Sequence, residues 1–434
     1  MKSMDRRDFI HKSLLGLAGG AIASESLPSA LFGSETIQPS NRITLGVIGL
    51  GKQGSGHLRG FLHRSDVQIV ALCDVDQFKL SNAQTTANKF YADKFGKGKY
   101  TSCAAYGDFR NLLDRTDIDA VVIATPDHWH ALMLDKAAQA GKDIYCEKPL
   151  SLTVSEARHM VSQVRRYGRI CQTGSQQRSD EKFRFACELV QNGYIGQLES
   201  ISVSIETGFF PFPRLCTLEE EPIPQELNWD LWLGPAPYRP YHHAIAPPIQ
   251  DGRWGRWRNY MDYSGGGMTD WGTHHFDIAQ WGMGKDQSGP VQISPPNSSG
   301  HPLTYTYENG VTMTMSAEGN GVLFKGSEGE VFVNRSILKT SPNSLKKIRI
   351  KPDELHLYRS DDHKQNWIDS IRSRSLPICD IEIGCRSVTV CHLGNISERL
   401  QRVLQWDPVS EQFLKDDEAN RLLHKPMRAP WRLS

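Results

Sequence analysis

Two groups of residues have the types and the spacing needed for proton-transfer chemistry. Lys148 stands near the end of an apolar run, with Glu147 before it and Pro149 after it, where a lysine can hydrogen-bond a substrate hydroxyl, lower its pKa and stabilise a developing alkoxide. Asp270 and His274 are spaced i and i+4 after three consecutive glycines, and Asp277 continues the same predicted helix face. A carboxylate one turn from a histidine can fix its tautomer. His274 is therefore predicted to act as a base with Asp270 assisting.

Each of these residues also has a plainer explanation when it is taken alone. A lysine after a strand is commonly a surface residue. An aspartate near a helix start is commonly a cap, and a histidine on an apolar face is commonly a core residue with its hydrogen bonds satisfied. Lys148, Asp270 and His274 together nevertheless indicate a site that could oxidise an alcohol.

The elements that must position this chemistry begin with a nucleotide-binding pattern. Ile43–Ile48 has the composition of a strand buried on both faces, and G-x-G-x-x-G follows at 49–54. Gly49 allows a tight turn, Gly51 allows close approach to a pyrophosphate, and Gly54 allows the next helix to pack near the strand. The first turn of that helix, which contains Lys52 and Gln53, would present free N–H groups to the phosphates.

An acidic residue completes the pattern. Asp74 lies twenty residues after Gly54, at the end of the second apolar run, where its carboxylate would accept hydrogen bonds from the adenosine ribose. This position favours NAD over NADP, although Gln77 and Lys79 leave NADP possible. A glycine-rich turn alone often marks only a tight loop. Here the strand, helix, second strand and carboxylate all indicate a dinucleotide site.

Strands and helices continue to alternate as far as Gln172, which predicts a doubly wound parallel sheet. Thr125, Pro126 and His130 follow one of these strands, so they should face the same crevice as the glycine turn. The predicted helices are 76–95, 109–115, 131–140 and 154–167, and the later strands are 119–124, 143–146 and 169–173.

The second half has a different pattern. Residues 198–206 alternate polar and apolar side chains, and short β-type runs recur at 303–307, 311–316 and 330–333, which predicts a mainly antiparallel sheet in a second, α+β domain. Predicted helices at 362–374 and 383–404 could fold back on the first domain. Residues 207–260, rich in Pro, Trp and Arg, should wrap the surface or a neighbouring subunit. Trp254 in this segment could stack on a sugar.

The first 40 residues have the features of an export signal. Arg6-Arg7 precedes a short apolar run, Leu14–Ala23, which is too short to span a bilayer as a mature helix. The arginine pair with Phe9 and Ile10 resembles a twin-arginine signal, although a disordered basic tail is the alternative. Residues 1–40 are therefore predicted to be signal and linker. They would direct the folded protein through the twin-arginine machinery to the periplasm.

Composition excludes some classes of partner. The chain has 434 residues and a net charge of +1, so there is no electrostatic reason to expect nucleic acid or an anionic membrane as a partner. The nine cysteines have no zinc-ligand spacing, and no metal is assigned. A site made from His128, His130, His274 and His275 is an alternative without a fixed coordination pattern.

Five motifs make the chain similar to a known family. The sequence resembles the glucose–fructose oxidoreductase and inositol dehydrogenase (Gfo/Idh/MocA) family in GVIGLGKQG, CDVD, ATPDHWH, CEKP and GGGMTDWGTHHFD. The resemblance implies a Rossmann domain, here 41–172. It also implies a C-terminal domain, here 173–434, whose large open, mainly antiparallel sheet often forms dimers or tetramers.

The resemblance also implies roles for single residues. Lys148 corresponds to the catalytic lysine, and His274 to the acceptor of the hydroxyl proton with Asp270 assisting. Thr125, Pro126, His130 and Glu147 correspond to the cofactor side. Arg178 corresponds to a position near nicotinamide and substrate. His275 beside His274 makes the identity of the base ambiguous.

These features lead to one expected function and two alternatives. The expected function is an NAD(H)-dependent oxidoreductase, with tightly held cofactor, acting on a secondary carbon of a sugar, polyol or glycoside. The first alternative is a redox-neutral NAD-dependent glycosidase or epimerase that works through a transient 3-keto sugar. Such hydrolases typically lack the lysine that this chain has as Lys148. The second alternative is a non-catalytic NAD-binding sensor, which would be expected to lose Lys148 or His274.

Overall fold

The computed structural model describes residues 41–96, 102–206 and 208–434, which form one compact unit from Asn41 to Ser434. The predicted export signal at 1–40 lies outside the described residues. Within the described part of the chain, every helix is either too short or too polar to cross a bilayer.

The first half of the unit is built on a six-stranded parallel sheet. Its strand order is β3-β2-β1-β4-β5-β6, and the order reverses between β1 and β4, where a dinucleotide-binding crevice is expected. This confirms the predicted doubly wound fold. The strands are β1 (Ile43–Ile48), β2 (Val67–Cys73), β3 (Ala104–Tyr106), β4 (Ala120–Ile123), β5 (Asp143–Cys146) and β6 (Cys171–Thr173).

Helices cover both faces of this sheet because successive strand residues point in opposite directions. Val47 contributes to the apolar cluster on one face, and Ile48 contributes to the cluster on the other. The first face is covered by α2 (Lys52–Leu62) and α3 (Gln77–Phe95). The second face is covered by α4 (Phe109–Leu113), α5 (Asp127–Gln139) and α6 (Val154–Arg166).

The start of α5 differs from the prediction. The helix was expected from Ala131, but it begins at Asp127, directly after Pro126 with φ −60° and ψ 152°. A carboxylate in the first helical turn is favourable next to the free N–H groups of the helix start. As a result, Asp127, His128 and His130 lie on a helix rather than in a loop.

The second half contains a nine-stranded sheet in which β7 and β10 run parallel while the other paired strands run antiparallel. The strand order is β13-β12-β11-β7-β10-β9-β8-β14-β15. This confirms the mainly antiparallel second sheet. The strands are β7 (Leu198–Ile205), β8 (Gln292–Ser294), β9 (Leu303–Thr306), β10 (Thr312–Ser316), β11 (Asn320–Gly326), β12 (Glu330–Val333), β13 (Leu338–Ser341), β14 (Leu404–Asp407) and β15 (Gln412–Phe413).

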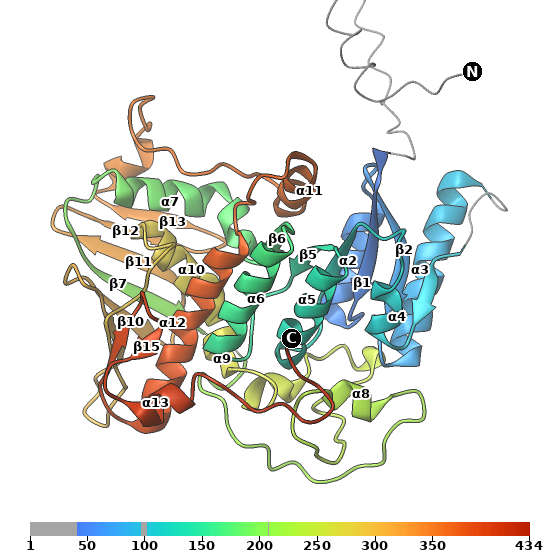
Figure 1. Ribbon diagram of the computed structural model, residues 1–434. Helices are drawn as coiled ribbons and strands as arrows, with labels where there is room; N and C mark the ends of the chain where they lie inside the picture. Colours follow the sequence, from blue (N-terminus) through green and yellow to red (C-terminus); the bar gives the residue numbers. More distant parts are fainter. Residues whose placement is uncertain (1–40, 97–101, 207) are drawn as a thin grey trace, which may run out of the picture. The chain divides into compact units, whose positions relative to one another are not determined.

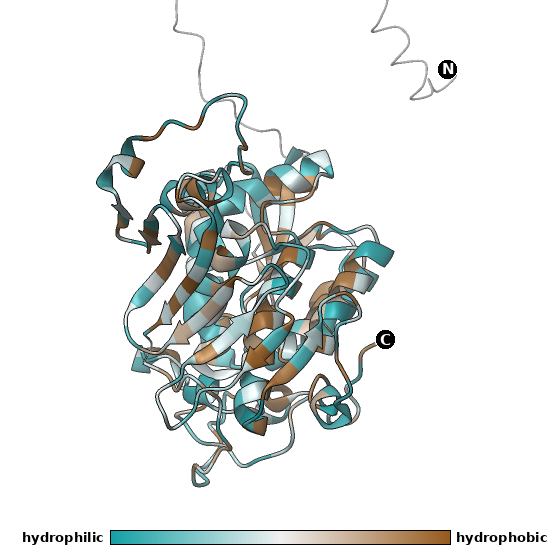
Figure 2. Cartoon of the chain, turned by 90° about the vertical axis from the view of Figure 1, so that its left-hand side faces the viewer, coloured by the Kyte–Doolittle hydropathy of each residue, from teal (hydrophilic) through white to brown (hydrophobic). Residues whose placement is uncertain are grey.

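Only one face of the central strands is packed into a core. Ile201, Val203 and Ile205 of β7 are buried against α7 (Glu181–Gln191) and α10 (Gly272–Gly282). The intervening serines of β7 are half-buried, and hydrophobic and hydrophilic residues alternate along the strands (Figure 2). The sheet therefore has one apolar and one polar face, as the alternating pattern of residues 198–206 predicts.

Two helices near the C-terminus connect the two halves. In α11 (His363–Ser373), Trp367 and Ile368 are buried in the core of the first sheet. The long helix α12 (Ile381–Leu400) packs beside α6 and contributes to the cores of both halves (Figure 1). After α13 (Asp417–Arg421), the chain returns to the first half, where Trp431 contacts Trp129.

The segment 208–260 has a small apolar core of its own. It contains α8 (Trp229–Leu233) and 3-10 turns at Ile249–Asp251 and Arg256–Asn259, and its tryptophans stack or pack edge-on with nearby tyrosines. The carbonyl of Trp232 accepts hydrogen bonds from His128 and Trp129 of α5. These bonds fix the segment against the first half. The last helix needed for the site is α9 (Gly266–Asp270), which precedes α10.

Candidate active site

A cavity of about 1380 Å³ lies outside the carboxyl ends of β1, β2, β4 and β5. Its other walls come from the segment 208–260, from the junction of α9 and α10, and from the turn after β12. Nine of the predicted cofactor residues line it, namely Gly49, Gly51, Lys52, Gln53, Asp74, Thr125, Pro126, Glu147 and Lys148. Asp270 and His274 line the same cavity, so the structure brings both predicted groups together.

The glycine turn has the geometry that its residue types predict. Gly49 has φ 86°, and a Cβ there would lie 2.7 Å from the carbonyl oxygen of Ala124. A Cβ at Gly54 would lie 1.8 Å from the carbonyl oxygen of Gly49, so this glycine packs against the turn and does not line the cavity. A Cβ at Gly51 would meet no heavy atom within 4 Å. Gly51 therefore leaves open space on the side of the cavity.

The start of α2 is available for phosphate. Its N-cap is Gly51, and no side chain caps the first turn. The Lys52 ammonium donates to the carbonyl of Gly252 at 2.7 Å and lies 4.9 Å from the ring of Trp254, so it joins the glycine turn to the segment 208–260. An uncapped helix start facing a cavity is a good environment for the charges of a pyrophosphate.

Asp74 is fixed at the end of β2 by backbone donors. Its two carboxylate oxygens accept from the N–H of Leu50 at 2.6 Å and of Asp76 at 2.9 Å. Burial raises the pKa of Asp74, while the charge of Lys79 and the two N–H groups oppose this rise. Each oxygen keeps a second lone pair for a ribose hydroxyl. Together, the open glycine turn, the uncapped helix and this carboxylate fit NAD.

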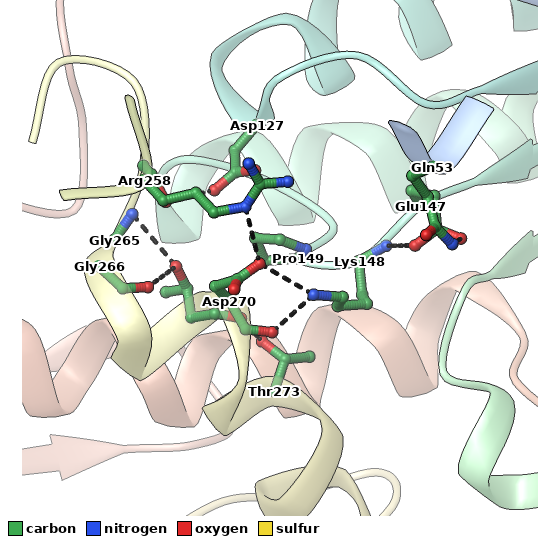
Figure 3. Close-up of polar contacts among 12 residues, drawn as sticks. Gln53, Asp127, Glu147, Lys148, Pro149, Arg258, Gly265, Gly266, Asp270 and Thr273 are labelled. Atoms are coloured by element: carbon green, nitrogen blue, oxygen red, sulfur yellow. Dashed lines mark hydrogen bonds and ion pairs between the residues drawn. The ribbon is translucent and has the colours of Figure 1, made fainter. Parts of the chain in front are cut away.

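At the end of the cavity away from the glycine turn, Lys148 and Asp270 form an ion pair (Figure 3). The ammonium of Lys148 donates to the carbonyl oxygen of Asp270 at 2.7 Å and to its carboxylate at 3.0 Å. Arg258 donates to the same carboxylate oxygen at 3.3 Å. Burial opposes the charge on Asp270, but the two cations outweigh burial and hold its pKa below the usual value. Asp270 therefore orients the ammonium of Lys148 through an ion pair and a backbone hydrogen bond.

The predicted contact between Asp270 and His274 is wrong. The two residues were expected on one face of a continuous helix, but α9 ends at Asp270 and α10 begins at Gly272, with Trp271 between them. The break changes the direction of the Asp270 side chain, which binds Lys148 and Arg258 instead of the histidine. Asp270 thus acts on the lysine and not on His274.

His274 is the histidine that faces the cavity. Its side chain is buried, and its Nδ1 has no hydrogen-bond partner among the described residues, which leaves Nε2 directed to the cavity. Burial, together with the charges of Lys148 and Arg335, holds the pKa of His274 well below the usual value. The ring is therefore neutral at physiological pH and can accept a proton.

Three predicted site residues lie behind the cavity wall. Arg178 is fully buried and forms ion pairs with Asp277 and Asp286, at 2.8 and 2.7 Å, so it stabilises the second half instead of binding substrate. The ring of His275 binds the carbonyl of Ser204 at 2.7 Å, so His274 is the one of the two histidines that lines the cavity.

His130 is the third of these residues. Its two ring nitrogens bind the carbonyls of Pro149 and Thr125, at 2.8 and 2.9 Å. It therefore positions the two loops that carry Thr125 and Lys148, and it has no direct access to a nicotinamide ring. Trp254, in contrast, lines the cavity with 42% of its surface exposed, as the stacking hypothesis requires.

Glu147 forms a separate buried network on the cofactor side. Its carboxylate accepts from His57 at 2.6 Å, from Gln53 at 2.8 Å and from Gln176 at 3.1 Å. Burial opposes its ionisation, but the hydrogen bond and charge of His57 lead the interactions that lower the pKa to about 2. Glu147 is therefore a fixed negative charge that holds the first turn of α2 in place.

Several residues of the site were missed at the level of sequence. Asp127 lines the cavity and accepts from the hydroxyl of Ser264 at 2.7 Å, and burial raises its pKa to about 7. Its place directly after Thr125-Pro126 at a strand end was a usable signal. Arg258 follows the predicted Trp254 by four residues. Arg335 had no such signal, because it follows a short strand with no motif around it.

The histidine-based metal alternative is not supported in the described residues. His128, His130 and His275 each bind a backbone carbonyl. The single group there with ligand atoms close enough for an ion is Glu221, His242 and His243. Nδ1 of His242 accepts from the N–H of Ala244, and the backbone N–H and the ring Nδ1 of His243 bind the Glu221 carboxylate at 2.7 and 2.8 Å. Hydrogen bonding therefore explains this group without an ion.

Comparisons with known proteins agree with this geometry. Residues 43–175 match the model of an oxidoreductase family NAD-binding Rossmann fold (GFO_IDH_MocA). Residues 181–433 match the model of the same oxidoreductase family's C-terminal alpha/beta domain (GFO_IDH_MocA_C2). Together the two matches cover both halves of the described chain.

Individual relatives are more distant. The oxidoreductase YrbE of Bacillus subtilis is 25% identical over 303 residues, which are 68% of this chain and 72% of that protein. Glycosyl hydrolase family 109 protein 2 of a Shewanella species is 28% identical over 212 residues, 46% of this chain and 45% of that protein. The chain thus spans less than half the length of that relative.

A solved structure shows the same fold. The WlbA dehydrogenase from Bordetella pertussis, in complex with NADH and UDP-GlcNAcA, superposes with a TM-score of 0.59 at 16% identity, over 84% of this chain and 99% of that one.

Proposed function

The chain belongs to the Gfo/Idh/MocA oxidoreductase family, and we propose that it transfers a hydride between NAD(H) and a secondary carbon of a sugar, polyol or glycoside. One observation carries the proposal. The glycine turn and Asp74, which fit a dinucleotide, line the same cavity as Lys148 and His274, which can handle a hydroxyl proton. The NADH complex of WlbA, which shares this fold, is consistent with the cofactor.

The residues divide the work of the oxidation between them. Lys148, oriented by Asp270, would donate a hydrogen bond to the reacting oxygen and stabilise its negative charge. His274, which is neutral, would take the hydroxyl proton on Nε2. NAD, when bound, supplies the acceptor for the hydride at C4 of its nicotinamide. The O–H and C–H bonds break, the hydride leaves with both electrons, and the carbon becomes a carbonyl.

One specific observation favours a second candidate, the redox-neutral glycosidase. A relative at 28% identity is named a family 109 glycosyl hydrolase. In that case a transient keto group would promote elimination of the aglycone, water would add to the resulting double bond, and the hydride would then return, so that no net reduction of cofactor occurs. The presence of Lys148, which such hydrolases typically lack, favours the net dehydrogenase.

The first experiment separates these two activities. The protein is purified without added nucleotide, denatured, and its released nucleotide is identified. The intact protein is then given a panel of sugars and glycosides while the absorbance of reduced nicotinamide is followed. A stable reduced signal and a keto sugar would support the dehydrogenase. Release of an aglycone without net reduction would support the glycosidase, and failure to bind NAD would refute both.

Localisation and assembly complete the proposal. We propose that Arg6-Arg7 directs twin-arginine export to the periplasm with the cofactor retained, because free NAD is scarce there. Replacing both arginines by lysine should keep the protein in the cytoplasmic fraction. We also propose that the polar face of the nine-stranded sheet forms a homodimer or homotetramer. The molar mass in solution by light scattering tests this assembly.

A further inference from the structure

Arg335 differs from the other cations of the cavity. It follows β12 in the turn to β13, where the side-chain oxygen of Asn334 accepts from the N–H groups of Ser336 and Ile337 and fixes the turn. Among residues 41–96, 102–206 and 208–434, no carboxylate forms an ion pair with Arg335. In contrast, the nearby cations are engaged, namely Lys148 and Arg258 by Asp270, Arg253 by Asp251, and Lys52 by the carbonyl of Gly252.

The side chain of Arg335 is exposed to solvent, and two contacts orient its guanidinium near the base. It lies 4.4 Å from the ring of Trp271, the residue that separates α9 from α10. With the Gln177 amide turned so that its nitrogen donates to the carbonyl of His274 at 2.7 Å, its oxygen accepts from Nε of Arg335 at 3.2 Å. Both terminal nitrogens of Arg335 are without a hydrogen-bond partner in the described residues. They remain available for a ligand in the cavity.

The surrounding acids do not neutralise this cation. Glu147 is already bound by His57, Gln53 and Gln176, and Asp180 is paired with Lys182. Glu206 also lines the cavity but is exposed to solvent and forms no ion pair with Arg335 in the described chain. The positive charges of Lys148 and Arg335 both lower the pKa of His274. The potential around the proposed base is therefore positive.

We propose that the substrate is a sugar or glycoside with one anionic substituent, a carboxylate or a sulfate ester, which binds the two terminal nitrogens of Arg335. The inference rests on the proposed function and adds the class of substrate. A guanidinium fork matches two oxygens of such a group and forms charge-assisted hydrogen bonds. A group of charge −1 balances the one uncommitted cation, whereas a phosphate monoester of about −2 would leave excess negative charge near Asp270 and Glu147.

The test uses sugars that differ only at the exocyclic carbon. NAD-loaded protein is given methyl hexopyranosides, the corresponding methyl hexuronides and the corresponding 6-sulfates, and KM and kcat are measured for each. The wild type should prefer at least one acidic member. Arg335→Met should lower its kcat/KM for that member by about 10- to 100-fold, mainly through KM, because charge-assisted hydrogen bonds are lost. The neutral hexoside should change by less than about threefold.

Two further variants separate recognition from structure. Lys339→Met removes an exposed cation from the same hairpin and should leave all three substrates unaffected. Arg335→Lys keeps the charge but loses the fork, so it should restore only part of the affinity for the acidic sugar. If the carboxylate and sulfate members respond differently, the preferred one identifies the natural group.

Specific results would overturn the inference. A wild type that prefers neutral sugars, or an Arg335→Met variant that loses neutral and acidic substrates equally, would show that Arg335 only supports Trp271. If no member is turned over, calorimetry with the NAD-loaded protein measures binding directly, and absence of binding by the acidic sugars also refutes the proposal. Failure of the proposed function is distinct, because it requires that no NAD is bound or that no sugar of any charge is oxidised.

Discussion

The two ends of the cavity are built in different ways. The nucleotide end comes from one short stretch, Gly49 to Asp74, and relies on backbone: a turn with positive φ, free N–H groups and a carboxylate held by two of them. The substrate end combines Lys148, Asp270, His274 and Arg335 from remote parts of the chain, and it relies on which charges are paired. Backbone geometry therefore sets cofactor binding, and charge pairing sets the chemistry.

The largest expected effect tests whether the two ends function independently. Lys148→Met should lower kcat by about 10³-fold, because the reacting oxygen loses its charged donor. NAD affinity should change little, since the glycine turn and Asp74 are untouched. Single-turnover kinetics and calorimetry with NAD measure the two quantities. A loss of less than about tenfold in kcat, with intact NAD binding, would remove Lys148 from the chemistry.

The next variant tests whether Arg178 belongs to the substrate end of the cavity. Arg178→Met should lower the free energy of unfolding by about 3–5 kcal/mol, because it leaves the buried charge of Asp277 unpaired. KM and kcat per folded molecule should remain near wild type. Arg359→Met, which breaks an exposed pair with Asp361, is the matched control and should leave the free energy of unfolding close to that of the wild type. Denaturant titration gives both values, and a large rise in KM would return Arg178 to the substrate pocket.

At the nucleotide end a smaller effect is expected. Asp74→Ser should weaken NAD binding by about 10- to 100-fold and reduce discrimination against NADP, because the carboxylate no longer meets the ribose hydroxyls. With saturating NAD, kcat should be preserved. Equilibrium binding of NAD and NADP to the variant and the wild type provides the comparison. Unchanged NAD affinity would contradict the assigned position of the adenosine ribose.

The smallest effect concerns Asp127, which lines the cavity between its two ends. The pKa of Asp127 is about 7 in the folded protein, while an unfolded aspartate titrates near about 3.9. The folded state binds more protons between these values, so stability falls as pH rises from about 4 to about 7. Asp127→Asn should remove this fall and keep the hydrogen bond from Ser264.

Thermal unfolding checks this prediction. The Tm of Asp127→Asn relative to wild type should be higher at about pH 8 than at about pH 5, where both side chains are neutral. Glu156, whose pKa is also raised by burial to about 7, is present in both proteins and cancels in the comparison. A Tm difference that does not change with pH would show that Asp127 titrates normally.

The difference between the nucleotide end and the substrate end explains which features could be predicted from the sequence. At the nucleotide end, the residues lie in one stretch from Gly49 to Asp74, so G-x-G-x-x-G predicted the turn and its spacing to Asp74 predicted a carboxylate at the end of the second strand. The parallel sheet followed from alternating apolar runs and helices, and the structure confirms it. Lys148 was likewise predicted from its place near a strand end, two residues after β5.

At the substrate end, helical spacing was not sufficient. The i, i+4 rule paired Asp270 with His274, but the helix breaks at Trp271 and tertiary contacts with Lys148 and Arg258 decide the direction of the carboxylate. Arg178 and His275 lie beside true cavity residues, Gln177 and His274, and only packing shows which neighbour faces inward. The role of Arg335 depends on the absence of an ion-pair partner, which a sequence pattern cannot show.

The return of the C-terminus to the first half has a consequence for biosynthesis. Trp367 fills the core of the first sheet, and Trp431 packs on Trp129 beside it. Ribosomes add roughly 5–20 residues per second, so the first sheet emerges on the order of ten seconds before its last covering residues. During this interval the nascent chain exposes apolar surface that chaperones would have to shield. Expression of residues 41–172 alone should accordingly give an insoluble product.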